Sequence, residues 1–121
     1  MSKSEHRIQD EIRLELSKHG IVLRLNAGKA YGGERVWDSR RNQYILINLR
    51  PIALCPKGTA DVLFVGEGGD VAFIECKDDK GRISQKQEAF IEMMKKYGYR
   101  AGVARSVEDA LKIIGVDPNE C

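Results

Sequence analysis

The clearest hydrophobic pattern lies near the N-terminus, where apolar residues recur every four positions. Ile8, Ile12 and Leu16 follow this spacing, which places them on one face of an α-helix. Ser4 suits the N-cap position, and Gly20 stands where a C-terminal stop is expected. The pattern therefore predicts a helix that begins at Ser4, ends before Gly20 and turns one apolar face to the core.

Two acidic residues of this helix are predicted to face different ways. With about 100° per residue and Ile12 as the reference, Glu5 lies about 20° from the centre of the apolar stripe and Glu11 about 100° from it. We therefore expect Glu5 to point inward. A carboxylate in the first turn also stabilises the helix dipole, so Glu5 has an ordinary structural explanation as well.

Short apolar runs after this helix predict strands. Residues 21–25 are rich in aliphatic and β-branched side chains. Residues 61–65 and 71–77 form two further runs on either side of a glycine-rich turn, 66–70, and predict an antiparallel hairpin. Residues 99–104 predict a last short strand.

Two serines each precede a helical pattern. The first pattern runs from Ser84 to a stop at Gly98, and the second from Ser106 to Gly115. The residues expected to form their apolar faces are Phe90, Met94 and Tyr97 in the first helix and Leu111, Ile113 and Ile114 in the second. The predicted order is α-β-(insert)-β-β-α-β-α, which lacks the regular alternation of a parallel α/β fold.

Residues 29–57 interrupt this order and mix basic with aromatic residues. Two runs, 35–37 and 44–47, flank a polar segment and predict a hairpin. Cations beside aromatic rings suit contact with phosphates and exposed bases. A solvated tip with Trp37 tucked into the core, or a dimer surface, explains the same residues, so these interpretations stay open.

Length and composition are those of one globular domain. The 121 residues are 42% hydrophobic and 31% charged, and no apolar run approaches the roughly 20 residues that span a membrane. We expect a single domain over 1–116, an insert at about 29–57, a tail at 117–121 and no membrane partner. Because the net charge is only +2, affinity for nucleic acid would need a local basic patch.

Cysteine usage and the N-terminus favour a cytoplasmic location. Cys55, Cys76 and Cys121 are odd in number and widely spaced, without a C-x-x-C pair, which disfavours structural zinc and a disulfide framework. The polar start of the chain lacks the apolar stretch of a secretory signal. We expect a protein of the reducing cytoplasm, and leave open whether its gene is cellular or belongs to a phage or prophage.

The end of the predicted central hairpin carries the candidate chemistry. Side chains alternate along a strand, so Glu75 and Lys77 share one face while Cys76 points to the other. If the hairpin closes symmetrically around residues 66–70, Asp61 lies opposite Glu75. Two adjacent carboxylates repel each other unless a cation lies between them, which predicts a site for a divalent metal.

Each of these residues has a use in phosphodiester hydrolysis. Asp61 and Glu75 offer hard oxygen ligands to Mg²⁺ or Mn²⁺, and the backbone carbonyl of Cys76 could complete the coordination. Lys77 supplies a positive charge to the phosphate, positions the attacking water or stabilises developing negative charge. The simpler explanation is a solvated strand end with a weak ion pair, which is common. Three features favour a functional site instead: the strand before Glu75 is apolar, Asp61 is expected opposite Glu75, and Gly58 lies shortly upstream.

These residues also resemble a known family. The segments Gly58-Thr59-Ala60-Asp61, Glu75-Cys76-Lys77 and Ser84-Gln85-Lys86-Gln87 are similar to motifs of the PD-(D/E)xK nuclease superfamily, specifically its VRR-NUC branch. Residues 4–9 and 24–28 resemble the opening helix and following strand of that branch. The resemblance covers most of the chain apart from 29–57 and the tail. Two departures are Ala60, where relatives usually have proline, and an arginine-rich end reduced to Val103-Ala104-Arg105.

The resemblance implies a restriction-endonuclease-like fold of the α/β (α+β) class, with a central mixed sheet and a core αβββαβ flanked by helices. It implies that Asp61 and Glu75 bind metal, that Lys77 is catalytic, and that Gln87 and Glu5 support the site. Gln87 has a structural explanation too, because Ser84 and Gln87 match a capping box.

The resemblance further implies a Mg²⁺- or Mn²⁺-dependent endonuclease that acts as a homodimer on branched DNA, with Holliday junctions favoured. The same chemistry on flap, linear or single-stranded DNA is one alternative; a non-catalytic DNA-binding module that retains the fold and a structural or assembly protein are others. Candidate nucleic-acid contacts are Arg24, Asn26, Lys29, Arg35, Arg40, Arg41 and Arg105. An edge-strand arginine and a turn asparagine explain the first two equally well.

Overall fold

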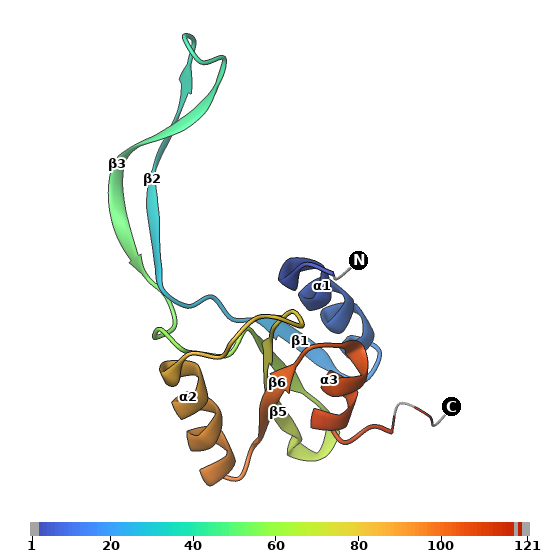
Figure 1. Cartoon of the computed structure of the whole chain (residues 1–121). Coiled ribbons are helices and arrows are strands. Elements are labelled where there is room, and N and C mark those ends of the chain that lie inside the picture. The colour runs from blue at the N-terminus through green and yellow to red at the C-terminus, as the bar shows by residue number, and fades with distance from the viewer. Residues whose placement is uncertain (1–2, 118, 120–121) are drawn as a thin grey trace.

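The central sheet has four strands in the order β1-β4-β5-β6 (Figure 1). The structure is a computed structural model and describes residues 3–117 and 119. The strands are β1 (Ile21–Arg24), β4 (Val62–Val65), β5 (Val71–Cys76) and β6 (Arg100–Ala104). The first three are antiparallel neighbours, whereas β6 runs parallel to β5. The sheet is therefore mixed, as predicted.

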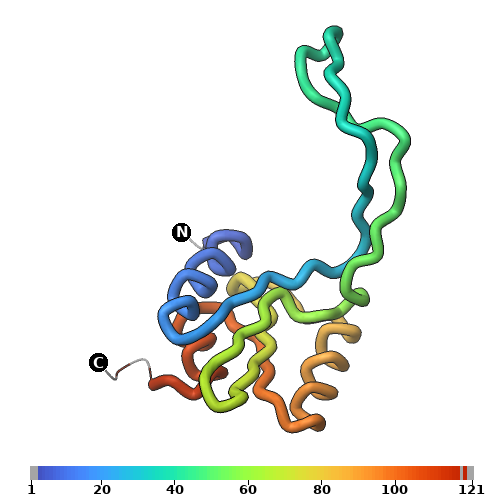
Figure 2. Tube along the Cα trace, turned by 180° about the vertical axis from the view of Figure 1, so that it is seen from behind, coloured from blue at the N-terminus to red at the C-terminus, as the bar shows by residue number. Residues whose placement is uncertain are grey.

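Helices cover both faces of this sheet. α1 (Glu5–Leu16) and α3 (Val107–Ile113) pack on the face to which Ala72, Ile74 and Cys76 point, and together they bury the main core. α2 (Gln85–Lys96) packs on the other face, where Phe90 meets Phe73 with 5.4 Å between ring centroids. Figure 2 shows α2 set apart from α1 and α3 across the sheet. The predicted element order and mixed α/β class are confirmed.

The register of the central hairpin positions the candidate site. Val62 pairs with Ile74 and Leu63 with Phe73, which is the symmetric closure that the sequence predicts. A short 3₁₀ helix, η1 (Glu67–Gly69), forms part of the turn. Because side chains alternate, this register buries Val62 in the core and leaves Asp61 on the α2 face beside Glu75.

A second, separate sheet has two strands, β2 (Lys29–Asp38) and β3 (Gln43–Ala53). It projects away from the rest of the molecule as a long hairpin in Figures 1 and 2, and we call residues 29–53 the arm. The predicted hairpin is confirmed and is longer than expected. Its register shifts by one residue between Gly32 and Glu34, opposite Asn48, which has a positive φ of 53°.

Two helix details differ from the sequence prediction. α1 ends at Leu16, because Ser17 is the C-cap and the next bonds are of the tighter 3₁₀ type. Gly20 has another function: a Cβ there would lie 2.5 Å from the Val65 carbonyl oxygen, so the glycine permits close approach to β4. In α2 the buried residue is Ile91, whereas Tyr97 is the C-cap and is 64% exposed.

The remaining predictions for chain organisation concern membranes, cysteines and the tail. No helix within residues 3–117 and 119 is long and apolar enough to cross a bilayer. Cys55 and Cys76 are free thiols, and Cys121 lies outside the described residues. Of the predicted tail, the structure describes Asp117 and Asn119 alone.

Candidate active site

Asp61 is held between two strands by backbone contacts. Its carbonyl accepts a hydrogen bond from the Leu25 N–H at 2.8 Å, which extends the pairing with β1. Its side-chain Oδ2 accepts a hydrogen bond from the Cys76 N–H, also at 2.8 Å. The carboxylate of Asp61 is therefore fixed at the end of β5, and its second oxygen, Oδ1, can serve another partner.

Glu75 is the only charged residue that is fully buried among those described, with 2% of its surface exposed. Its Oε1 accepts a hydrogen bond of 2.9 Å from the Gln87 amide. Its Oε2 has no hydrogen-bond partner within the described part of the chain. A buried carboxylate oxygen without a partner is costly, so this atom favours a proton or a cation.

Electrostatics at Glu75 support the same conclusion. Burial raises the pKa of Glu75 to about 8, and the negative charge of Asp61 adds to the shift. The positive charge of Lys77 opposes it. The carboxyl is therefore mostly protonated at neutral pH unless a positive ion replaces the proton.

Lys77 and Glu5 complete the group. The Lys77 ammonium lies 3.8 Å from Glu75 Oε1 and 3.5 Å from Glu5 Oε1. The Lys77 backbone N–H donates to the Ala104 carbonyl at 3.1 Å, which keeps the residue beside β6. Glu5 is predicted to point inward; its carboxylate does approach Lys77, but its side chain is about half exposed.

The first turn of α2 supports Glu75 through one amide side chain. Ser84 Oγ accepts from the Gln87 N–H at 3.1 Å, and Gln87 Oε1 accepts from the Ser84 N–H at 2.8 Å. This is the capping box that the sequence predicts. Nε2 of the same amide donates to Glu75, so the capping box and a contact with a candidate ligand are made by one side chain. The role of Gln87 in the site stays a prediction.

Gly58 brings the chain before Asp61 against α2. Its φ is +96°, and a Cβ at this position would lie 2.7 Å from Lys86 Cβ and 2.8 Å from Lys86 backbone atoms. Only glycine fits such a conformation and such an approach without strain. The distance between the Asp61 segment and the helix turn that carries Gln87 therefore depends on Gly58.

The residues present fit a divalent ion with few protein ligands. Within residues 3–117 and 119, no group of three or more His, Cys, Asp or Glu side chains is placed to hold a metal on its own. Asp61 and Glu75 would be the two side-chain ligands, with the Cys76 carbonyl as the predicted third. Mg²⁺ commonly binds through one or two carboxylates and takes its other oxygens from water and phosphate.

Comparison with known proteins decides the family. Residues 3–108 match the VRR-NUC domain. The chain belongs to the VRR-NUC family. Its fold is thereby the restriction-endonuclease-like fold, and its domain is that of a nuclease of the PD-(D/E)xK type. No curated protein matches the chain.

Apart from Arg105, the predicted nucleic-acid contacts of this VRR-NUC domain fall into two groups. Arg24 and Asn26 lie at the end of β1, next to the Asp61 segment, and Lys29 begins the arm. The other arm residues on the predicted list, Arg35, Arg40 and Arg41, lie far out along the hairpin. The structure thus separates a group near the carboxylates from a group on the arm.

Arg105 has a function that sequence reasoning missed. Its guanidinium donates to the backbone carbonyls of Asp78 and Gly81, in the loop that follows Lys77. Its side chain thereby fixes the path of the chain from β5 towards α2. Contact of Arg105 with phosphate stays a prediction, and no local sequence signal pointed to the loop.

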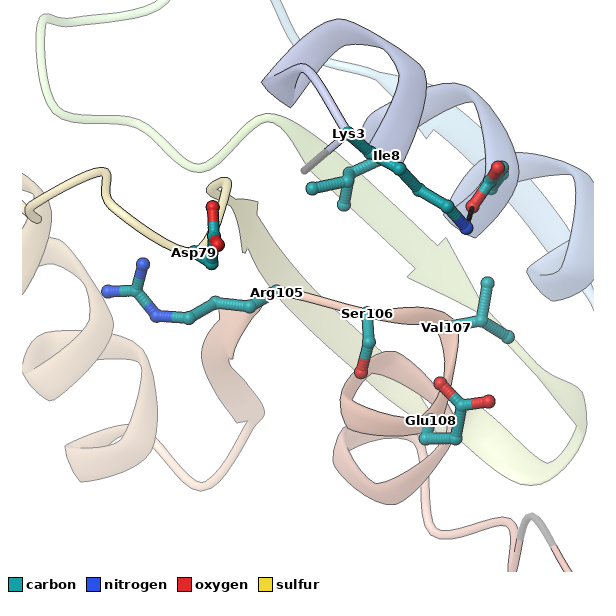
Figure 3. A pocket seen from close by; sticks show the side chains of 8 residues that line it. Lys3, Ile8, Asp79, Arg105, Ser106, Val107 and Glu108 are labelled. Atoms are coloured by element: carbon teal, nitrogen blue, oxygen red, sulfur yellow. Dashed lines mark hydrogen bonds and ion pairs between the residues drawn. The ribbon is translucent and has the colours of Figure 1, made fainter. Parts of the chain in front are cut away.

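A hollow of about 330 Å³ lies next to Arg105, between α1, this loop and the start of α3 (Figure 3). Lys3 and Glu11 at its rim pair with each other at 2.7 Å. None of Asp61, Glu75 and Lys77 lines it. A second hollow lies between the base of the arm and Gln87, and therefore adjoins the carboxylate site.

Proposed function

We propose that this chain is a metal-dependent endonuclease that hydrolyses DNA phosphodiester bonds. The observation that carries the proposal is the buried Glu75 carboxylate beside Asp61. Its Oε2 has no hydrogen-bond partner among the described residues, and its Oε1 lies 3.8 Å from the Lys77 ammonium. A purely structural acid would be paired at both oxygens or exposed to water. Membership of a nuclease family supports the same chemistry.

Asp61 and Glu75 would hold Mg²⁺ or Mn²⁺, with the Cys76 carbonyl as a further ligand. When bound, the ion would polarise a phosphoryl oxygen and lower the pKa of a coordinated water. Gln87 keeps Glu75 in place by donating to Oε1, which would leave Oε2 free to bind the ion. Asp61 is kept in place by the Cys76 N–H.

Lys77 would stabilise charge that develops on the phosphate. Its side chain is 15% exposed, so its field is less screened than that of a surface lysine. Glu5 balances that charge from α1 and keeps the ammonium near the carboxylates. Lys77 can thus donate hydrogen bonds to a phosphate oxygen or to the attacking water.

For the substrate we propose branched DNA, with four-way junctions favoured, and a homodimer that offers one site to each of two strands. This rests on likeness to stand-alone members of the branch. The first alternative keeps the chemistry and changes the target to flaps, linear duplexes or single strands. A non-catalytic DNA-binding module is the alternative of another class, and the intact Asp61, Glu75 and Lys77 argue against it.

A panel of labelled DNA structures, incubated with Mg²⁺ or Mn²⁺, tests these proposals. We expect cutting of branched DNA that requires the metal, and equal cutting of linear duplex would reject junction selectivity. DNA binding without cutting under either metal would favour the binding module.

Substitutions test the assigned roles. Lys77→Ala should lower the cutting rate by at least about a hundredfold while the fold persists, and Asp61→Ala should also weaken metal binding. Lys96→Ala, which removes a lysine from the far end of α2, is the matched control and should cut like the parent. Near-native cutting by the Lys77 or Asp61 variant would remove that residue from the mechanism.

A further inference from the structure

The arm leaves large apolar and aromatic side chains uncovered along its length. Trp37 is 53% exposed and Tyr44 is 56% exposed, and Leu46, Leu49 and Ile52 are also exposed. The arm is a sheet of its own with two strands, and no other strand pairs with it among the described residues. Isolated hairpins are only marginally stable in water, and exposed apolar surface of this kind marks contact with a partner.

Charge distribution identifies the kind of partner. The arm contains five basic and two acidic residues, a net charge of +3, whereas the rest of the chain contains 15 basic and 16 acidic residues, a net charge of −1. The net charge of the arm, +3, therefore exceeds the net charge of the whole chain, +2. A local field of this sign attracts a polyanion, even though the molecule as a whole is nearly neutral.

The outer half of the arm arranges this charge beside aromatic rings. Trp37 pairs with Tyr44 across the strands, edge to face, with 5.1 Å between ring centroids. Arg35 lies on the same face of the ribbon, and its guanidinium carbon is 3.7 Å from the centroid of Tyr44. Asp38 accepts from the Arg40 N–H and from the Arg41 guanidinium, which orders the turn at the tip.

We propose that the arm binds DNA and that Trp37 and Tyr44 stack on unpaired bases, while Arg40 and Arg50 contact phosphates. Stacking needs a base whose face is free, so the arm would select DNA that carries unpaired nucleotides next to the duplex, as at a branch point or a flap. This inference rests on the proposed function in taking DNA as the ligand.

The length of the arm sets where this contact falls. β2 has ten residues, and at about 3.3 Å per residue it reaches roughly 30 Å from its base. At about 3.4 Å per base step, that distance corresponds to about nine base pairs. The base of the arm lies near Asp61, because the Asn26 carbonyl accepts from the Cys55 N–H and the preceding Leu25 N–H donates to the Asp61 carbonyl. The arm would therefore contact DNA nearly one helical turn from the bond that is cut.

Trp37 reports on this contact directly, because it is the only tryptophan in the chain. The wild-type protein is titrated, in EDTA to prevent metal-dependent cutting, with a single-stranded oligonucleotide, a branched junction and a blunt duplex of equal length. Stacking on a base quenches indole emission. We expect quenching by the single strand and the junction and little by the blunt duplex. Equal quenching by all three, or by none, would overturn the stacking assignment.

Variants measure the energetic contribution of the arm. Trp37→Ala should weaken binding to the junction about tenfold, and Trp37→Phe should restore most of it. Tyr97→Ala, which removes another exposed tyrosine from the end of α2, is the control and should bind normally. If Trp37→Ala binds as tightly as wild type while its thermal melt is unchanged, the arm is not a DNA-binding element.

Salt dependence tests the phosphate contacts. Arg40 and Arg50 make no ion pair within the described residues, so Arg40→Gln with Arg50→Gln should reduce the slope of log affinity against log salt by about 2. Lys96→Gln with Lys112→Gln changes the net charge equally at the far side of the molecule and should leave the slope nearly unchanged. Equal effects of the two pairs would mean that global charge, and not the arm, attracts DNA.

A second copy of the chain is the competing partner, and the same reagents identify it. If Trp37 emission shifts with protein concentration in the absence of DNA, and if Trp37→Ala halves the mass in solution but leaves DNA affinity unchanged, the arm serves assembly and the proposal is wrong. If instead the proposed nuclease function is wrong, the wild type would cut no DNA, but Trp37 emission would still be quenched by DNA with unpaired bases.

Discussion

The substitution Glu75→Gln tests how much the negative charge of Glu75 destabilises the folded protein, because it removes the charge and nearly preserves the shape of the side chain. Glutamine has nearly the same volume and keeps a carbonyl oxygen for the Gln87 amide, which now meets Glu75 Oε1 at 2.9 Å. It cannot ionise. The groups that face this position, Asp61, Lys77 and Glu5, remain in the variant. Differences between the two metal-free proteins as pH changes therefore report mainly the charge on Glu75.

The magnitude follows from the pKa of Glu75, which burial and Asp61 raise from 4.5 to about 8. Below the lower value the carboxyl is neutral in both the folded and the unfolded state. Between the two values the unfolded chain ionises while the folded protein keeps its proton, so the free energy of unfolding falls as pH rises. At about 1.4 kcal/mol per pKa unit, the loss is a few kcal/mol and at most about 5 kcal/mol, complete above pH 8.

Thermal melts in EDTA between pH 4 and pH 9 measure this loss. We expect the wild type to lose stability relative to Glu75→Gln through this range, with the two curves meeting near pH 4. Excess Mn²⁺ should narrow the gap at pH 8, because a metal that binds only the folded protein adds about 2.7 kcal/mol at a hundred times its Kd, which offsets about half of the loss. The gain should shrink at pH 6, where protons compete for Glu75.

Parallel curves for wild type and Glu75→Gln in EDTA would refute the reasoning, because Glu75 would then ionise equally in both states. A Mn²⁺-induced gain in Glu75→Gln as large as in wild type would place the ion elsewhere. Both results are independent of DNA cutting.

Two further predictions concern the support of the site. Gly58→Ala should slow cutting and destabilise the protein by more than the roughly 1–2 kcal/mol that a positive φ costs, because a Cβ there would lie 2.7 Å from Lys86. Gly28→Ala is the matched control, since Gly28 has a φ of +94° and a Cβ there would have nothing within 4 Å. Equal losses of melting temperature in the two variants would refute the packing argument. Arg105→Gln should keep the global fold but speed hydrogen exchange at residues 78–83 and lower kcat, because two carbonyl contacts are lost; unchanged exchange there would leave Arg105 without a positioning role.

Sequence reasoning placed Asp61 beside Glu75 correctly because the register of the central hairpin follows local rules. A glycine-rich turn and period-two alternation determine the register, and the register places Asp61 beside Glu75. The capping box likewise follows from two residues three positions apart. Glu5 could be placed because the helical period relates it to the Ile8, Ile12 and Leu16 stripe.

Features that depend on tertiary packing could not be predicted in this way. The burial of Glu75 depends on α2 lying over β5, and Ile91 rather than Tyr97 is buried because the sheet lies under the middle of that helix. Arg105 contacts carbonyls 24 and 27 residues earlier in the chain. The arm was recognised as a hairpin, but nothing in its pattern indicated that it would leave the core altogether.

The two carboxylates of the site are held in opposite ways, and this difference links folding to chemistry. Asp61 accepts a hydrogen bond from a backbone N–H and is partly exposed to solvent. Glu75 is buried, and its Oε2 has no partner in the described part of the chain, so its charged form is unfavourable until a proton or a cation is bound. An ion bound there would relieve a cost that the folded protein already bears. Metal affinity and stability should therefore change together in every variant that alters the surroundings of Glu75.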